Sequence, residues 1–292
     1  MDQHHLSPRS ITLEAPWRAA RSLAKLRRPS WFDRTKACWA LIPTRKLVVF
    51  VHGFGGDALG TWRQFSDLWP PGDAGYDLVF YGYDSLRQQV IYSGSELREF
   101  LETFLAAPAD MINPTVEHLT AINPGILRRA FTYQKVVFVA HSLGAIIIRE
   151  ALVEAEQNHP PWMTGSELVL FAPAHKGAFA TKVALAGLTG VPFAHAIVSL
   201  VTLKVRALAD LDEKSLEPLE KRTLDAINAR GARALEPLRA STVVFPMYDS
   251  VVEQKPFGRD AGAKTFPGCG HSDVCKPRPD FTDPIDVVEP LL

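Results

Sequence analysis

Five short runs of consecutive apolar residues constrain the fold more than any other feature of the chain. Because these runs are apolar at nearly every position, rather than at alternate positions, we expect them to be strands buried on both faces. Strands of this kind form parallel sheets that helices cover on both sides. A sixth, weaker candidate lies at 263–267. The five runs are KLVVFV (46–51), DLVFYGY (77–83), KVVFVA (135–140), ELVLFA (167–172) and TVVFPMY (242–248).

Two longer stretches between these runs have the apolar spacing of helices. They are residues 94–107 and 143–157, and each is long enough to connect two parallel strands by a right-handed crossover. With 292 residues, 47% of them hydrophobic, the chain can bury one large core. The sequence therefore predicts an α/β domain over 46–292, with a mostly parallel sheet covered by helices on both faces.

Residues 1–45 are predicted to form a basic N-terminal arm. Residues 1–46 contain ten Lys or Arg and only three acidic residues. In the whole chain, 32 basic residues balance 32 acidic residues, and this zero net charge argues against a nucleic-acid partner. An organelle transit peptide is the alternative, although three prolines interrupt the long helix that it would need. No secretory signal pattern opens the chain, and three cysteines are an odd number, so we expect free thiols and a cytoplasmic location.

Residues 175–240 separate the last two strong strands and are predicted to be a helical cap insertion. Residues 183–203 within it contain no Asp, Glu, Lys or Arg and are long enough to span a membrane. Strands of one sheet precede and follow them, so we predict membrane contact at most, without a crossing. The apolar residues of 178–205 are predicted to line a substrate pocket, with plain packing against the sheet as the alternative. The pocket candidates are Leu188, Val191 and Phe193.

Ser142 lies in the sequence AHSLG, which is the G-x-S-x-G pattern with Ala140 in place of the first glycine. The pattern marks a sharp turn from strand to helix that lifts the serine hydroxyl out of the sheet, and only small residues fit two positions before and after it. Ser142 stands between an apolar run and a helical stretch, as the pattern requires. A serine that merely caps the helix is the alternative.

The sequence VFVHGFGGD (49–57) also follows a buried strand and is rich in glycine. A backbone that donates an N–H to the developing oxyanion of a reacting carbonyl needs room around it, which glycine provides. We predict the N–H groups of Phe54 and Leu143 as the two donors. The alternative is a phosphate-binding loop, but neither G-x-x-x-x-G-K-[ST] nor G-x-G-x-x-G occurs there.

A nucleophilic serine needs a histidine base. When the serine lies on such a turn, the three residues follow one another along the chain in the order serine, acid, histidine. Of the nine histidines, five precede Ser142, and the last of these, His141, adjoins it and is expected to point elsewhere. Only His271 lies after the last strong strand. We therefore predict His271 as the base.

Asp249 follows the run 242–248 directly and is the predicted acid of this group. A carboxylate there can accept the imidazole N–H, fix its tautomer and stabilise the imidazolium. Aspartate also favours simple turns, so its position after Ser142 and before His271 favours the catalytic interpretation. Glu253 and Asp273 are the alternatives for this role.

Four potential metal ligands lie close together in GCGHSDVCKP (268–277). Zinc sites usually bring a second pair of ligands from elsewhere, and Cys38 is the other cysteine of the chain. We therefore predict no metal and a structural role for the two thiols. The four residues are Cys269, His271, Asp273 and Cys275.

The chain resembles the α/β-hydrolase superfamily, and within it lipase-like serine esterases related to GPI inositol-deacylase domains. The resemblance covers about 46–277 and is carried by VVFVHGFGGD, YGYDS (81–85), FVAHSLGAIIIREAL (138–152), APAHKGA (172–178) and HSDVCKP (271–277). Where these esterases usually read Pro-His-x-Gly-Ser, Ala174 stands between Pro173 and His175, and Ala178 replaces the serine. The resemblance implies an α/β-hydrolase fold and hydrolysis of small-molecule or lipid-like carboxylic esters through an acyl-enzyme, without metal or organic cofactor.

Two other functions stay open from the sequence. A hydrolase-fold interaction module without activity would use the basic arm to bind a partner, since a fold alone does not establish an activity. A thioesterase or acyltransferase would use the same three residues and differ only in leaving group or acceptor.

Overall fold

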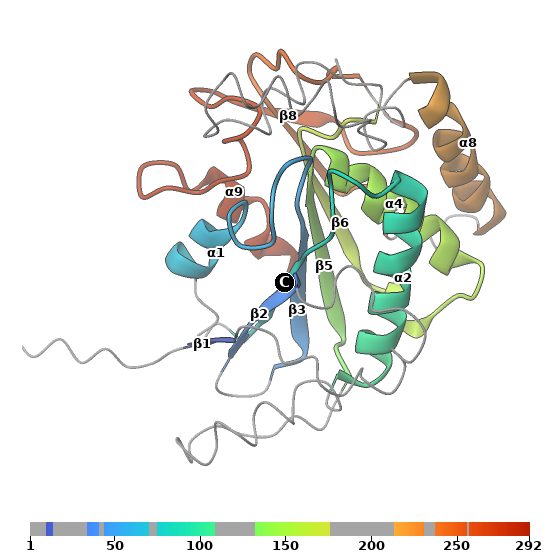
Figure 1. The fold of residues 1–292 in the computed structure, drawn as a ribbon, viewed down its shortest axis with the longest axis horizontal. Helices are drawn as coiled ribbons and strands as arrows, with labels where there is room; N and C mark the ends of the chain where they lie inside the picture. The colour runs from blue at the N-terminus through green and yellow to red at the C-terminus, as the bar shows by residue number, and fades with distance from the viewer. Residues whose placement is uncertain are drawn as a thin grey trace, which may run out of the picture.

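The computed structural model describes residues 10–13, 34–40, 44–69, 75–108, 132–175, 213–230, 237–255 and 257–292. Within these ranges, eight strands form one sheet in the order β1-β2-β4-β3-β5-β6-β7-β8 (Figure 1). All pairs from β4 to β8 are parallel, which confirms the predicted fold class. The strands are β1 (Ser10–Leu13), β2 (Lys36–Ala40), β3 (Lys46–Val51), β4 (Asp77–Tyr81), β5 (Lys135–His141), β6 (Glu167–Phe171), β7 (Thr242–Pro246) and β8 (Ala263–Phe266).

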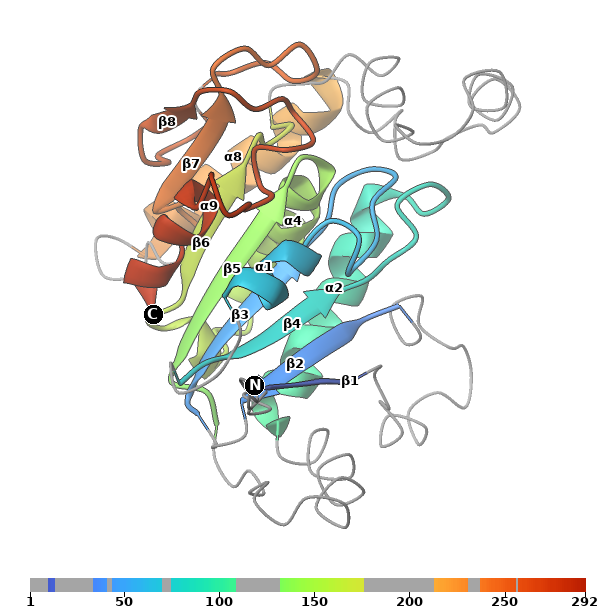
Figure 2. The ribbon, with the colours of Figure 1, turned by 90° about the vertical axis from the view of Figure 1, so that its left-hand side faces the viewer.

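Helices cover both faces of the sheet. Figure 2 shows α1 (Arg63–Leu68) and α9 (Asp283–Asp286) on one face, and α2 (Val90–Ala106), α4 (Leu143–Glu156) and α8 (Glu213–Arg230) on the other. Every residue of β4 is buried, and so is every residue of β3 after Lys46. Burial on both faces explains why the strand sequences are apolar throughout rather than alternating. Short 3₁₀ turns at η2 (Pro161–Met163) and η4 (Glu289–Leu291) complete the described elements.

An aromatic cluster joins α1 to the centre of the sheet. The ring centroid of Phe50, on β3, lies 5.0 Å from that of Trp62, 4.8 Å from that of Phe65 and 5.1 Å from that of Phe80. All four side chains are fully buried. Rings at such separations contribute more than their buried area alone. The cluster therefore fixes the segment that follows the glycine-rich loop.

Two strands of the sheet lie within the segment that the sequence predicts as an arm. β2 pairs antiparallel with β4, and β1 pairs antiparallel with β2. The backbone N–H of Ala40 donates to Asp77 Oδ1 at 2.7 Å, and the Tyr133 hydroxyl donates to Asp77 Oδ2 at 2.7 Å. The sheet therefore includes two strands that precede residue 46 in the sequence. The buried carboxylate of Asp77 fixes the edge of the sheet at which they lie.

Of the predicted insertion 175–240, the structure describes His175, α8 and residues 237–240. The pocket candidates Leu188, Val191 and Phe193 lie outside the described residues, as does most of the predicted arm. Among the described helices, none is both long and apolar enough to cross a membrane.

Candidate active site

Ser142 occupies a strained turn between β5 and α4. Its backbone has φ 52° and ψ −119°, in the region that favours glycine. The Ser142 side chain makes no capping hydrogen bond to α4, so the alternative of a simple helix cap is wrong. A Cβ added to Gly144 would lie 2.5 Å from the carbonyl oxygens of Val51 and His52, which explains the glycine two positions after the serine. A strained turn from strand to helix is the backbone geometry that the G-x-S-x-G pattern predicts.

The structure brings Ser142, His271 and Asp249 together in one hydrogen-bonded chain. His271 Nε2 lies 3.0 Å from Ser142 Oγ, and His271 Nδ1 lies 2.8 Å from Asp249 Oδ2. The three residues follow β5, β8 and β7, whose carboxyl ends meet at one edge of the parallel sheet. Residues up to 129 positions apart in the sequence thus come within hydrogen-bonding distance.

Both carboxylate oxygens of Asp249 accept hydrogen bonds. Oδ1 accepts from the N–H groups of Val251 at 2.8 Å and Val252 at 3.1 Å, while Oδ2 faces His271. Burial alone would raise the pKa of Asp249, but the bonds from His271 and from these amides outweigh it and lower the pKa. An ionised carboxylate at this place holds the proton of His271 on Nδ1. Nε2 is then free to accept the proton of Ser142.

The two alternative acids do not occupy this position. Glu253 forms an ion pair with Lys255. Asp273 has no hydrogen bond to His271, whose two ring nitrogens face Asp249 and Ser142. The geometry therefore favours Asp249 among the three candidates.

His141 contacts the loop that carries His271, a role that the sequence did not reveal. Its Nε2 lies 2.8 Å from the backbone carbonyl oxygen of His271, and the two ring centroids are 5.0 Å apart. Burial, followed by the nearby charge of His271, lowers the pKa of His141 to about 3. His141 is therefore neutral and donates its Nε2–H to that carbonyl. The bond ties the end of β5 to the His271 loop.

Buried polar contacts with the segment after β4 hold the glycine-rich loop that follows β3. His52 stacks on Tyr83 with ring centroids 4.3 Å apart, and the Tyr83 hydroxyl donates to the His52 carbonyl oxygen at 2.8 Å. Burial lowers the pKa of His52 to about 4, so its ring is neutral as well. Gly55 N–H donates to Ser85 Oγ at 3.0 Å. The motif YGYDS thus supports the loop.

The glycine-rich loop approaches Ser142 closely. A Cβ added to Gly53 would lie 3.0 Å from the Ser142 Cβ and 2.9 Å from His141 Nδ1. The N–H groups of Phe54 and Leu143 donate to no oxygen in the described ranges, so both are free for another acceptor. Their role as oxyanion donors stays a prediction.

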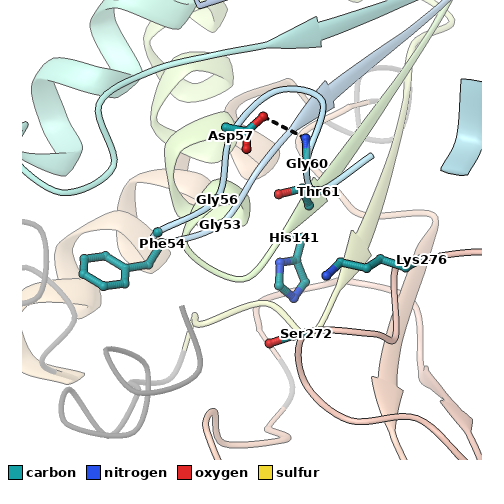
Figure 3. A pocket seen from close by; sticks show the side chains of 10 residues that line it. Gly53, Phe54, Gly56, Asp57, Gly60, Thr61, His141, Ser272 and Lys276 are labelled. Atoms are coloured by element: carbon teal, nitrogen blue, oxygen red, sulfur yellow. Dashed lines mark hydrogen bonds between the residues drawn. The ribbon is translucent and has the colours of Figure 1, made fainter. Parts of the chain in front are cut away.

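A polar cavity of about 220 Å³ is lined by His141 and Ser272, the neighbours of Ser142 and His271 in the sequence (Figure 3). One wall is the glycine-rich loop, and the other contains His141 and the loop that follows His271. Figure 3 shows the Phe54 side chain directed away from it. Sequence reasoning missed this cavity.

The cysteines and their neighbours do not form a metal centre in the described structure. No group of three or more His, Cys, Asp or Glu side chains there could hold a metal ion. None of the three cysteines, all of them in the described ranges, forms a disulfide, so the thiols are unoxidised as predicted. Burial raises the pKa of the Cys275 thiol to about 12, so this side chain packs as an apolar group.

Comparison with known proteins gives one family match. Residues 48–288 match the model of the Alpha/beta hydrolase family. No curated protein matches the chain.

Similar solved structures include the mature lipase BlEst2 of Bacillus licheniformis, with 14% identity over 89% of this chain and 98% of that chain and a TM-score of 0.48. Another is the type II thioesterase YbtT of the yersiniabactin pathway, with 16% identity over 88% and 98% and a TM-score of 0.48. A third is a 2-hydroxy-6-oxo-6-phenylhexa-2,4-dienoate hydrolase of Rhodococcus, with 13% identity over 87% and 93% and a TM-score of 0.46.

Proposed function

Because the chain belongs to the alpha/beta hydrolase family, we propose that it is a serine esterase that cleaves carboxylic esters through an acyl-enzyme on Ser142. The observation that carries the proposal is the chain of contacts from Asp249 through His271 to Ser142, with distances of 2.8 and 3.0 Å. Asp249 orients the base, His271 takes the proton, and Ser142 is the nucleophile. The narrower relation to GPI inositol-deacylase domains stays a prediction.

Acylation begins with attack of Ser142 Oγ on the ester carbonyl carbon. The hydroxyl proton moves to His271 Nε2 as the Oγ–C bond forms and the carbonyl π electrons move to oxygen. Asp249 stabilises the resulting imidazolium. The bond to the alcohol oxygen then breaks, and that oxygen takes the proton from Nε2 and leaves as the alcohol.

Deacylation repeats the sequence with water. Water gives a proton to His271 Nε2 and attacks the acyl carbon, and the acid is released as Ser142 regains its proton. We propose the N–H groups of Phe54 and Leu143 as donors to the oxyanion in both steps. The scheme uses no metal and no organic cofactor.

The acyl chain is proposed to lie against apolar residues of 178–205, with Leu188, Val191 and Phe193 in the wall. Each buried methylene would contribute about 0.8 kcal/mol to binding. This part of the proposal rests on the sequence, since these residues lie outside the described ranges.

Covalent labelling tests the nucleophile. A fluorophosphonate probe is expected to label the wild type and not Ser142→Ala, which should also lose hydrolysis of para-nitrophenyl butyrate. Ser95→Ala removes a half-buried hydroxyl of α2 that bonds to Glu154, away from Ser142, and serves as the matched control that should keep both. Labelling of another serine, or of none in the folded protein, would contradict the proposal and favour an inactive interaction module.

Product analysis separates hydrolysis from the related chemistries. Release of the free acid from esters, faster than from thioesters of the same chain and without transfer to added alcohols, supports the esterase. Dominant thioester cleavage or dominant transfer to alcohols would instead identify a thioesterase or an acyltransferase.

A further inference from the structure

The cavity beside the triad contains polar groups that the proposed mechanism does not use. A Cβ added to Gly53, which lines the cavity, would lie 3.0 Å from the Ser142 Cβ. Ser272, also in the lining, directly follows His271 in the sequence. A substrate group in this cavity would therefore be attached close to the scissile bond.

Three polar side chains of the cavity have no partner in the part of the chain that the structure describes. The half-buried Lys276 forms no ion pair there, and the hydroxyls of Thr61 and Ser272 form no hydrogen bond there. Figure 3 shows Lys276 and His141 directed towards the same space, with Thr61 and Ser272 on opposite sides of it. Ammonium and hydroxyl groups are hydrogen-bond donors. The cavity thus offers several donors and one positive charge to a ligand.

Asp57 is the acidic residue of the lining, and its contacts direct it towards its own loop. Its Oδ1 accepts from the N–H groups of Leu59 at 2.9 Å and Gly60 at 2.7 Å, and Figure 3 shows the bond to Gly60. The Asp57 side chain is exposed, where water and salt screen its charge. Asp57 therefore does not neutralise Lys276 through an ion pair.

We propose that this cavity binds an anionic group of the substrate, a carboxylate or a phosphate, and that Lys276 is its specificity-determining residue. The inference rests on the proposed esterase function and narrows its substrates to esters with a negative charge near the scissile carbonyl. Lys276 supplies the charge, while Ser272 and Thr61 donate to the remaining oxygens of the anion. His141 is neutral, so it adds no charge of its own to the cavity.

Binding of the anion alone tests the cavity without any need for hydrolysis. Isothermal titration calorimetry with glycerol phosphate and with succinate compares the wild type with Lys276→Met, Lys276→Arg and Lys264→Met. Lys264 is an exposed lysine of β8 and serves as the matched control. We expect Lys276→Met to weaken binding about tenfold, as loss of a hydrogen bond to a charged group does. Lys276→Arg should retain binding, and Lys264→Met should not change it.

Hydrolysis then shows which part of the substrate carries the charge. The ratio of kcat/KM for para-nitrophenyl hemiglutarate to that for para-nitrophenyl valerate tests an anion on the acyl side. The ratio for acylglycerol phosphate to that for the matching acylglycerol tests the alcohol side. At least one ratio should exceed one in the wild type, fall about tenfold in Lys276→Met and recover in Lys276→Arg.

The failures of the two proposals are distinguishable. Equal anion binding by the wild type and Lys276→Met, or none by the wild type, overturns the anion site whatever the hydrolytic activity. Two kcat/KM ratios that stay at one also overturn it, because the anion would then be no part of the substrate. Anion binding that depends on Lys276 in a protein that hydrolyses no ester contradicts the esterase proposal instead.

Discussion

Replacement of Asp260 by alanine is expected to cost more stability than loss of any surface ion pair, because it leaves a buried guanidinium without its counter-charge. Arg149 lies on α4 with its side chain 1% exposed, and it forms an ion pair with Asp260, whose side chain is 7% exposed. The guanidinium also donates to Leu238 O and to His175 Nε2, both at 2.9 Å. These neutral acceptors remain in the variant and cannot balance the charge.

The expected loss follows from the contacts of Asp260. Removing one partner of a buried ion pair costs about 3–5 kcal/mol. Adding the two lost hydrogen bonds gives a similar figure. The bond from Arg149 is worth about 1.5–3 kcal/mol, and a neutral bond such as that from the Ala240 N–H to Asp260 Oδ1 is worth about 0.5–1.5 kcal/mol. The N···O distance of this second bond is 2.8 Å. A loss of about 4 kcal/mol lowers Tm by roughly 8–16 °C for a domain of about this size.

Urea unfolding of matched variants measures this loss. Glu102→Ala is the control, because Glu102 pairs with Arg98 on the surface of α2 with both side chains about one-third exposed. That pair is worth about 0.3–0.5 kcal/mol. The double variant Arg149→Met/Asp260→Leu should recover most of the loss, since it removes both charges. If Asp260→Ala loses no more free energy of unfolding than Glu102→Ala, the reasoning from the buried charge is wrong.

Three further predictions concern catalysis, pH and substrate length. Asp249→Asn is expected to lower kcat by orders of magnitude through the wrong His271 tautomer, with the fold retained by circular dichroism; a silent Asp249→Asn beside an inactive Glu253→Gln would contradict the assignment. Folded His141 and His52, with pKa lowered to about 3 and about 4 by burial, stay neutral while the unfolded imidazoles protonate below about pH 6.5. The contribution of these histidines to the free energy of unfolding is therefore fully present above that pH, and it falls towards pH 4 by about 1.4 kcal/mol per pH unit for each histidine. A free energy of unfolding from urea titrations that stays constant between about pH 7 and pH 5 would refute this. Polar substitution of Phe193 should lower kcat/KM for octanoate esters more than for acetate esters, whereas equal losses would indicate plain core packing.

The central strands and the turn at Ser142 could be predicted because each depends on local sequence. KLVVFV is apolar throughout because helices cover both faces of β3, and the AHSLG turn has a steric rule of its own. β2 escaped prediction because its sequence, KACWA, is short and its place depends on Asp77, a buried carboxylate on another strand.

The contact of His141 and the cavity around Lys276 could not be predicted from local patterns. His141 donates to a carbonyl 130 positions away, and no periodicity in either segment indicates that contact. Nothing in the sequence distinguishes Lys276 from the other lysines and arginines of the chain. Only the fold shows that it lies across the cavity from the glycine-rich loop. Such features arise from tertiary structure alone.

The separation of 129 positions between Ser142 and His271 has a consequence for synthesis on the ribosome. Translation at about 5–20 residues per second needs on the order of 10 s to add that length of chain. During this interval the nascent chain already carries the serine turn, while the acid and the base of the proposed triad have not been made. The proposed ester cleavage can therefore begin only when the last strands join the sheet, and any message truncated before His271 yields Ser142 without its proposed base.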